Sequence, residues 1–247
     1  MPLPTPKSPT EQDPTEQGQT GPSQTRADLS ARGPTATLPH LSRIRAATGG
    51  ILAAVLLSAC VGAGQTSAGG RASESFLATS GAPMQWDHRP EAAEWTEEAF
   101  EAVAGRDREL AGLVPEDIEH WCPGYETASL DERRAFWVGL MSAVAKHESR
   151  WTPEIEGGGG RYIGLMQISP TTARGHGCEA TSKSALKDGA GNLSCAVDIF
   201  AGKVARDGMV AGGGNRGVGR DWGPFRKADK RAEMAAWTSA QPYCAKG

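Results

Sequence analysis

The tryptophans of this 247-residue chain are very unevenly distributed, because all seven lie after position 85. Residues 1–39, in contrast, are rich in Pro, Thr, Gln, Ser and Gly and contain few large apolar side chains. A segment of this composition cannot bury enough surface to offset the entropy lost on ordering, so we expect it to be disordered. The hydrophobic core, and any aromatic surface for a ligand, should therefore lie in the C-terminal part.

Residues 40–59 have the order of charges and apolar residues that is typical of an export signal. Arg43 and Arg45 precede an apolar run, Ile51 to Leu57, that is too short to span a bilayer. The run ends in Leu57-Ser58-Ala59-Cys60, which resembles the lipobox of bacterial lipoproteins. Alternatives are an ordinary signal peptide that is cut nearby, or a buried helix.

The lipobox resemblance implies that the chain is cut before Cys60 and that lipid is attached to the cysteine. Several acyl chains would hold the protein stably on a membrane. Val61, not an aspartate, follows the cysteine. By resemblance to Gram-negative lipoproteins, this implies the outer membrane, with the protein facing the periplasm. Residues 60–93, rich in Gly, Ala, Ser and Thr, then form a predicted flexible tether, and residues 94–247 form the predicted folded domain.

Four further cysteines predict two disulfides and therefore an oxidising compartment. Four cysteines allow three pairings. We favour Cys178–Cys195, which are close in sequence, and Cys122–Cys244, which would tie the ends of the domain together. The other pairings, or four buried free thiols, remain open. The Cys and His spacings are not those of a zinc site.

Helical periodicity and capping residues predict a mainly α domain. Ser129 and Glu132 have the spacing of a capping box, and Ser169 precedes a proline at a first helical position. The glycine-rich segment 157–163 predicts a loop, and Gly164–Ile168 is strand-like. The predicted helices are 96–105, 130–149, 170–175, 192–207 and 226–238.

The stretch from Ala145 to Ala173 carries the most specific pattern in the chain. It contains Glu148-Ser149, then Gly164-Leu165-Met166-Gln167-Ile168, and then Pro170-Thr171. In this order and separation, these elements resemble the catalytic core of SLT-type lytic transglycosylases, relatives of goose-type lysozyme. The resemblance implies a mainly α, α+β lysozyme-like fold with a small β-hairpin at the active-site cleft. It also implies cleavage of peptidoglycan glycan strands.

Glu148 is the predicted catalytic residue. It falls near the C-terminal end of a predicted helix, where the helix dipole disfavours a carboxylate and raises its pKa. Trp151 and Met166 would desolvate it further, and a carboxyl that stays protonated can give a proton to a glycosidic oxygen. The resemblance implies that the same Glu then acts as base on the C6 hydroxyl of N-acetylmuramic acid and gives a 1,6-anhydro product.

The resemblance also implies substrate contacts around Glu148. Ser149 would bond the glutamate or the substrate, although a bond to a free helix carbonyl is an equal alternative. Gln167 can donate and accept, which suits an N-acetyl group. Met166 by resemblance lines the cleft, although packing is the more common role of methionine. The predicted substrate-binding residues are Ser149, Tyr162, Gly164, Met166, Gln167, Asn192 and Trp222.

The sequence departs from the family after residue 210. Family members usually carry Ala-Tyr-Asn and then Ala-Gly, whereas the segment 211–225 here is glycine-rich and contains Trp222. The tyrosine that contacts the catalytic glutamate has no evident counterpart, and we expect Trp222 to fill its space. Asn192 fits the family's asparagine at the start of the cleft helix, where we expect an N-cap.

Two other functions remain open at this point. Glu154 or Glu156 could hold a water and make the domain a lysozyme-like muramidase, or the protein could be a silent lipoprotein that binds peptidoglycan. The net charge of -3 gives no indication of nucleic-acid binding. We expect a monomer that needs no metal or organic cofactor.

Overall fold

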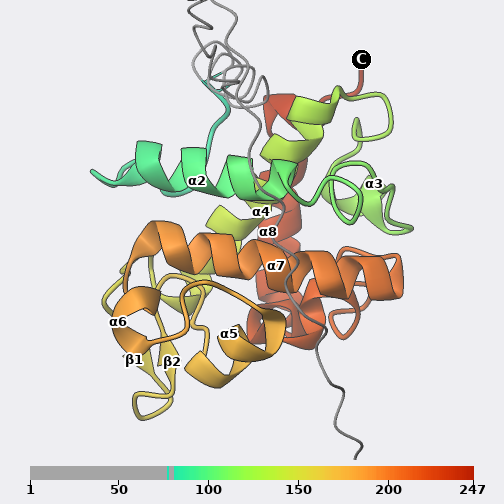
Figure 1. Ribbon diagram of the computed structural model, residues 1–247. Coiled ribbons are helices and arrows are strands. Elements are labelled where there is room, and N and C mark those ends of the chain that lie inside the picture. The colour runs from blue at the N-terminus through green and yellow to red at the C-terminus, as the bar shows by residue number, and fades with distance from the viewer. Residues whose placement is uncertain (1–76, 78–80) are drawn as a thin grey trace, which may run out of the picture. The chain divides into compact units, whose positions relative to one another are not determined.

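The computed structural model describes Leu77 and residues 81–247, which belong to one compact unit (Figure 1). The predicted disordered extension, the predicted export signal and Cys60, the predicted site of lipid attachment, lie outside the described residues. In the described part, every helix is too short or too polar to cross a membrane. The fold is mainly α with one small antiparallel sheet, which confirms the predicted fold class.

Helix α4 (Leu130–Glu148) is the central element of the fold. The Ser129 side chain accepts a hydrogen bond from the backbone N–H of Glu132, and the Glu132 carboxylate accepts one from the backbone N–H of Ser129. Every residue from Ala135 to Ala145 is buried. The predicted helix and its capping box are thus confirmed, and a helix buried on all sides must be surrounded by other elements.

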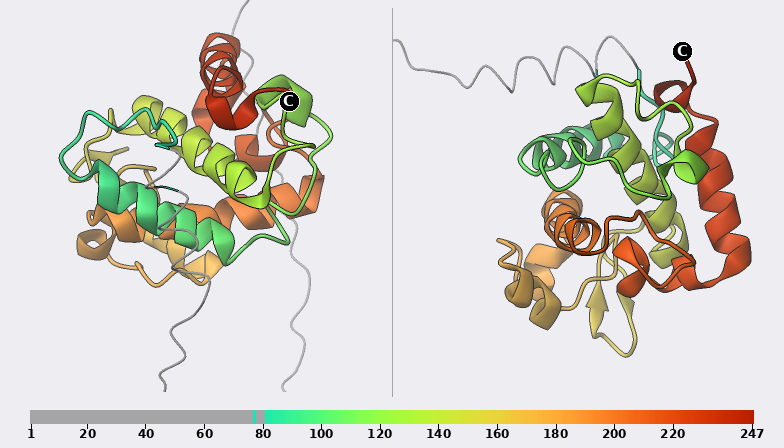
Figure 2. Two further views of the ribbon diagram at one scale, coloured as in Figure 1. Left: turned by 90° about the horizontal axis from the view of Figure 1, so that it is seen from above. Right: turned by 90° about the vertical axis from the view of Figure 1, so that its right-hand side faces the viewer.

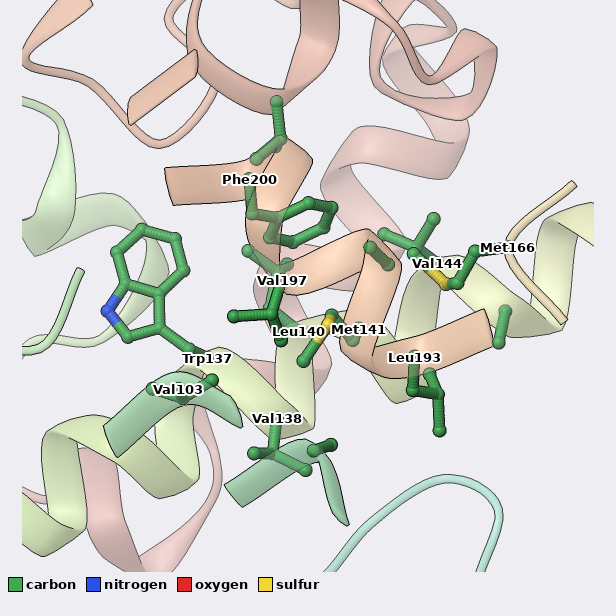
Figure 3. Close-up of a cluster of buried hydrophobic side chains, with 14 of the residues drawn as sticks. Val103, Trp137, Val138, Leu140, Met141, Val144, Met166, Leu193, Val197 and Phe200 are labelled. Carbon is green, nitrogen blue, oxygen red and sulfur yellow. The ribbon is translucent and has the colours of Figure 1, made fainter. Parts of the chain in front are cut away.

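Three other helices, each of at least 12 residues, surround α4. Helix α2 (Ala92–Ala104) packs against both α4 and α7 (Gly189–Asp207), while α8 (Ala228–Ser239) covers another side of α4. Figure 2 shows α4 between α2 and α8. The core forms where apolar side chains of these helices meet, and Figure 3 shows part of it. Its labelled members are Val103, Trp137, Val138, Leu140, Met141, Val144, Met166, Leu193, Val197 and Phe200.

Strands β1 (Glu156–Gly157) and β2 (Tyr162–Ile163) form an antiparallel hairpin with a glycine-rich tip. The predicted strand at Gly164–Ile168 is therefore wrong, because the paired residues come earlier. Gly164 and Gln167 have φ angles of 81° and 51°, which an extended strand cannot contain. Residues 164–167 form a turn instead, and Ile163 bridges to Ile168 across it.

The remaining helices agree with the sequence in part. Helix α5 (Pro170–His176) begins after its predicted cap, Ser169. Helix α7 begins earlier than predicted, because the Asp188 side chain accepts a hydrogen bond from Gly191 and is the N-cap. The expectation of an N-cap at Asn192 is therefore wrong. The short helices, which had no prediction, are α3 (Ile118–Trp121), α6 (Lys183–Leu186), η1 (Gly217–Arg220), η2 (Gly223–Arg226) and η3 (Pro242–Cys244).

The folded part begins before the predicted boundary at residue 94. Met84 and Trp86 are buried in the core. The Trp86 indole N–H donates to the hydroxyl of Thr96 at 2.9 Å, and the backbone N–H of Gln85 donates to the hydroxyl of Ser142 at 2.9 Å. The last residues assigned to the tether are thus part of the domain.

Both disulfides have the favoured pairing. Cys122–Cys244 joins the residue after α3 to η3, and Cys178–Cys195 joins the segment after α5 to α7. The first bridge holds the C-terminal segment beside the start of the folded part, where the Tyr243 hydroxyl donates to the carbonyl of Pro83 at 3.2 Å.

We predict that Trp86→Ala lowers the free energy of unfolding by about 3–5 kcal/mol, because it leaves a large cavity in the core. Urea denaturation measures this loss. The exposed aromatic residue Tyr162 supplies the control, since Tyr162→Ala should change stability by only about 0.5 kcal/mol. Equal effects of the two substitutions would contradict the burial of the segment before α2.

Candidate active site

Glu148 is the last residue of α4, at the edge of the core. Its side chain is partly buried and accepts no hydrogen bond from the described residues. Burial raises the pKa of Glu148 to about 7, and the positive charge of Lys230 on α8 acts in the opposite direction. A large fraction of this carboxyl therefore stays protonated near neutral pH, as a general acid requires.

The chain turns sharply after Glu148. Arg150 and Trp151 have φ angles of 54° and 57°, and Gln167 is the third non-glycine residue with left-handed backbone in the described part. Such conformations cost about 1–3 kcal/mol each and concentrate at functional sites. Trp151 is held in place by its indole N–H, which donates to the carbonyl of Ser142 at 2.9 Å, and by edge contact with His88 at 4.7 Å.

The turn 164–167 is fixed by the side chain of Asn192, which is fully buried on α7. Asn192 Oδ1 accepts the backbone N–H of Met166 at 2.8 Å, and Nδ2 donates to the carbonyls of Ile163 and Leu186 at 3.0 and 2.9 Å. A Cβ on Gly164 would lie 2.4 Å from Asn192 Nδ2, so only glycine fits there. One amide thus joins the hairpin, the turn and the end of α6.

Trp222 supports the same turn from the segment that departs from the family. Its indole N–H donates to the carbonyl of Met166 at 2.9 Å, and its ring packs against Phe200 at 4.7 Å. The carboxylate of Asp117 anchors the start of this segment by accepting three backbone N–H groups, from residues 210, 211 and 212. The segment therefore has its own anchors in place of the family's motif.

The turn lies close to the C-terminal half of α4. Met166 is fully buried, and its side chain reaches toward Val144 in the core (Figure 3). Val144 precedes Glu148 by four residues and so lies on the same face of the helix. The structure therefore brings together the two halves of the sequence motif.

Most of the predicted substrate-binding residues are buried. Ser149 is 2% exposed, and its hydroxyl donates to the carbonyl of Ala145 at 3.2 Å, which is the alternative role left open for it. Among the predicted residues, only Tyr162, at 41% exposed, and the half-buried Gln167 present side chains to solvent. For the others the structure shows a supporting role. These buried residues are Ser149, Gly164, Met166, Asn192 and Trp222.

The two candidate second carboxylates differ in their surroundings. Glu156 lies 3.1 Å from Lys183 and 2.7 Å from Lys187, both from α6 or its end. Hydrogen bonds from Lys187 and Lys183 lower the pKa of Glu156. Both residues are exposed, but only Glu156 forms ion pairs with described residues, and these clamp the hairpin to α6.

In the described part of the chain, no three His, Cys, Asp or Glu side chains cluster closely enough to hold a metal ion. The charge that acts on Glu148 is that of Lys230 on α8, and the sequence motif gave no signal for it. Its position depends on how α8 packs against α4, which only the structure shows.

We predict that Asn192→Ala lowers the free energy of unfolding by about 3 kcal/mol, because it leaves the N–H of Met166 and the carbonyl of Leu186 without partners and removes one of the two hydrogen bonds to the carbonyl of Ile163. Chemical denaturation measures this effect. Asn215 is exposed, so Asn215→Ala should be nearly neutral. A loss of less than about 1 kcal/mol for the Asn192 variant would contradict its role as the support of the turn.

Because the pKa of Glu148 is raised in the folded state, the free energy of unfolding should fall as pH rises and the carboxyl becomes charged. The folded-state pKa of about 7 exceeds the ordinary value of 4.5. The stability that the folded state gains by holding Glu148 protonated is therefore fully present below pH 4.5 and is lost as pH rises through 7. Relative to Glu148→Gln, the wild type should lose at most on the order of 3 kcal/mol over this range. Urea denaturation of both proteins across the range measures it, and a difference independent of pH would contradict the burial of the carboxyl.

Comparisons with known proteins agree with this geometry. Residues 128–235 match the family model of the transglycosylase SLT domain. The chain is similar in structure to wild-type DslA (Bd0314), with a TM-score of 0.60 and 24% identity over 66% of this chain and 98% of that chain. A glutamate-to-glutamine mutant of DslA gives a TM-score of 0.61 with the same identity and coverage. Curated proteins gave no match to this sequence.

At 24% identity, the DslA structures establish the fold alone. The family match covers the part of the chain that holds Glu148, the hairpin, the turn 164–167 and Asn192. Residues 128–235 are thus similar to transglycosylase SLT domains, and the described part of the chain has a lysozyme-like fold.

Proposed function

We propose that this protein is a peptidoglycan lytic transglycosylase that cleaves the β-1,4 bond between N-acetylmuramic acid and N-acetylglucosamine. The observation that carries the proposal is the carboxyl of Glu148, which is partly buried at the end of α4 and has a pKa raised to about 7. The SLT family match supports peptidoglycan as the substrate class. A carboxyl that titrates near neutral pH can act first as an acid and then as a base.

In the proposed mechanism, Glu148 performs both proton transfers. Its carboxyl gives a proton to the glycosidic oxygen as the bond from that oxygen to C1 of the muramic acid breaks. The resulting carboxylate then removes the proton of the C6 hydroxyl, while the C6 oxygen forms a bond to C1. The product carries a 1,6-anhydro ring, no water is consumed, and Glu148 ends protonated as it began.

Gln167 and Tyr162 are the proposed sugar contacts on the hairpin side. The side-chain amide of Gln167 donates to the carbonyls of Ile155 and Gly164, at 3.3 and 2.9 Å. Both donors are thus directed to the protein, and no described residue donates to Oε1. This oxygen is therefore suited to accept the N–H of an N-acetyl group.

The surroundings of Glu156 favour a transglycosylase over a muramidase. Hydrolysis by a pair of carboxylates requires a second group that activates water. Glu156 is bound to two lysines and faces α6, so it is engaged in holding the hairpin. A mechanism with one carboxyl fits the described residues better.

We further propose that the domain acts from a membrane, as a monomer. A lipid on Cys60 would anchor it to the outer membrane, and residues before Met84 would carry it toward the glycan strands. The two disulfides fit the oxidising periplasm that this location implies.

We predict that Glu148→Gln reduces the release of soluble glycan fragments from purified peptidoglycan by about 10²–10⁴-fold, because the amide cannot supply the proton. Release of fragments by the purified protein is followed over time. Glu154→Gln and Glu156→Gln are matched controls that should retain most activity.

Full activity of the Glu148 variant would move the catalytic role elsewhere. Loss of activity in the Glu154 or Glu156 variant, with folding intact, would favour a hydrolase. A wild-type protein that binds peptidoglycan without cleaving it would identify a silent envelope protein.

A further inference from the structure

Lys230 is a half-buried lysine on α8 that forms no ion pair within the described part of the chain. Glu233, three residues after Lys230 on α8, contacts α4 and so shows which part of α4 the Lys230 face of α8 meets. The Glu233 carboxylate bonds the ammonium of Lys146 through Oε1, and its Oε2 lies 3.6 Å from His147 Nε2. Residues three apart share a face of a helix, so Lys230 also faces the last turn of α4.

The charged groups at this contact come from two helices. Glu233 forms an ion pair with Lys146 and lies beside His147, both on α4. This leaves the cation Lys230 and the carboxyls of Glu148 and Asp229 without partners at hydrogen-bonding distance among the described residues, and of these two carboxyls only Glu148 is partly buried. The titratable groups at the contact are Lys146, His147 and Glu148 on α4, and Asp229, Lys230 and Glu233 on α8.

The charge of Lys230 acts on three of these titratable groups, Glu148, His147 and Glu233. It lowers the pKa of Glu148 against the larger effect of burial, and it also lowers the pKa values of His147 and Glu233. Burial, the largest cause, lowers the pKa of His147, so this imidazole is mostly neutral near pH 7. Since Lys146 is bound to Glu233, Lys230 is the cation that remains for Glu148.

We propose that Lys230 is a positioning residue for Glu148, whose ammonium stabilises the carboxylate that Glu148 becomes after it has protonated the leaving oxygen. The inference rests on the proposed function. In the proposed mechanism the Glu148 side chain is neutral before it donates its proton, charged after that transfer, and neutral again once it has taken the proton of the C6 hydroxyl. Burial favours only the neutral form, and a nearby fixed cation offsets this preference when the charge develops.

The test is a titration of Glu148 in the purified protein, labelled with carbon-13 at the glutamate side-chain carboxyls. The spectrum of Glu148→Gln assigns the signal. In Lys230→Met, the titration midpoint of Glu148 should rise by about one pH unit, because an opposite charge has been removed. Lys230→Arg should keep the wild-type midpoint. Lys227 is exposed on the same helix end, and Lys227→Met is the matched control that should leave the midpoint unchanged.

The pH profile of peptidoglycan cleavage gives a second readout. Glu148 must be protonated to act, so the alkaline limb of kcat/KM should move to higher pH in Lys230→Met, and the plateau rate should fall. If Lys230→Met only disturbed packing, the rate would fall but the alkaline limb of the pH profile would stay at the wild-type pH.

An unchanged midpoint in a folded Lys230→Met protein would overturn the proposal, and Lys230→Gln provides a second neutral variant. A wild-type protein without cleavage activity would instead refute the proposed function. Because the titration is independent of activity, it would still decide whether Lys230 acts on Glu148.

Discussion

The burial of α4 on every side is the constraint on which the rest of the structure depends. A helix whose residues 135–145 are all buried must be enclosed by α2, α8 and the side chains of α7. Glu148 follows one turn later, where the buried part of the helix ends. Its carboxyl is therefore desolvated without being sealed from solvent, and this position accounts for its raised pKa. The chemistry of the proposed site is thus a consequence of core packing.

The turn 164–167 shows how the fold supports a site with few exposed side chains. Its backbone is left-handed at both ends, and Asn192 and Trp222 hold its middle through the N–H and the carbonyl of Met166. These two supports come from separate segments, α7 and the loop before η2. The buried residues fix the geometry, which leaves Gln167 and Tyr162 for contact with a substrate.

Local signals in the sequence predicted much of this fold. The capping box at Ser129 and the proline after Ser169 each lie next to the helix end that they determine. The start of α7 was placed too late because Gly189 and Gly191 weaken the helical pattern of its first turn. Trp86 falls outside the predicted domain because the Gly-, Ala-, Ser- and Thr-rich composition before it predicts a tether, whereas its partners lie on α2 and in the core.

The candidate site could be predicted only in part. The motif led to Glu148, and the wider family resemblance named Asn192 and Trp222, although as contacts to substrate. The hydrogen bonds of these side chains span 26 and 56 residues, so the local sequence pattern could not reveal that they point inward. Lys230 carried no signal for the same reason, since its relation to Glu148 depends on the packing of α8 against α4.

The nature of the glycan ends tests the proposed single-carboxyl chemistry most directly. Purified peptidoglycan would be digested with the protein, and the released fragments would be weighed by mass spectrometry. Proton transfer to and from Glu148 alone predicts fragments that end in 1,6-anhydro-N-acetylmuramic acid, each lighter by one water than a lysozyme product. Fragments with reducing ends would contradict this chemistry, because they require a water that a second group has activated.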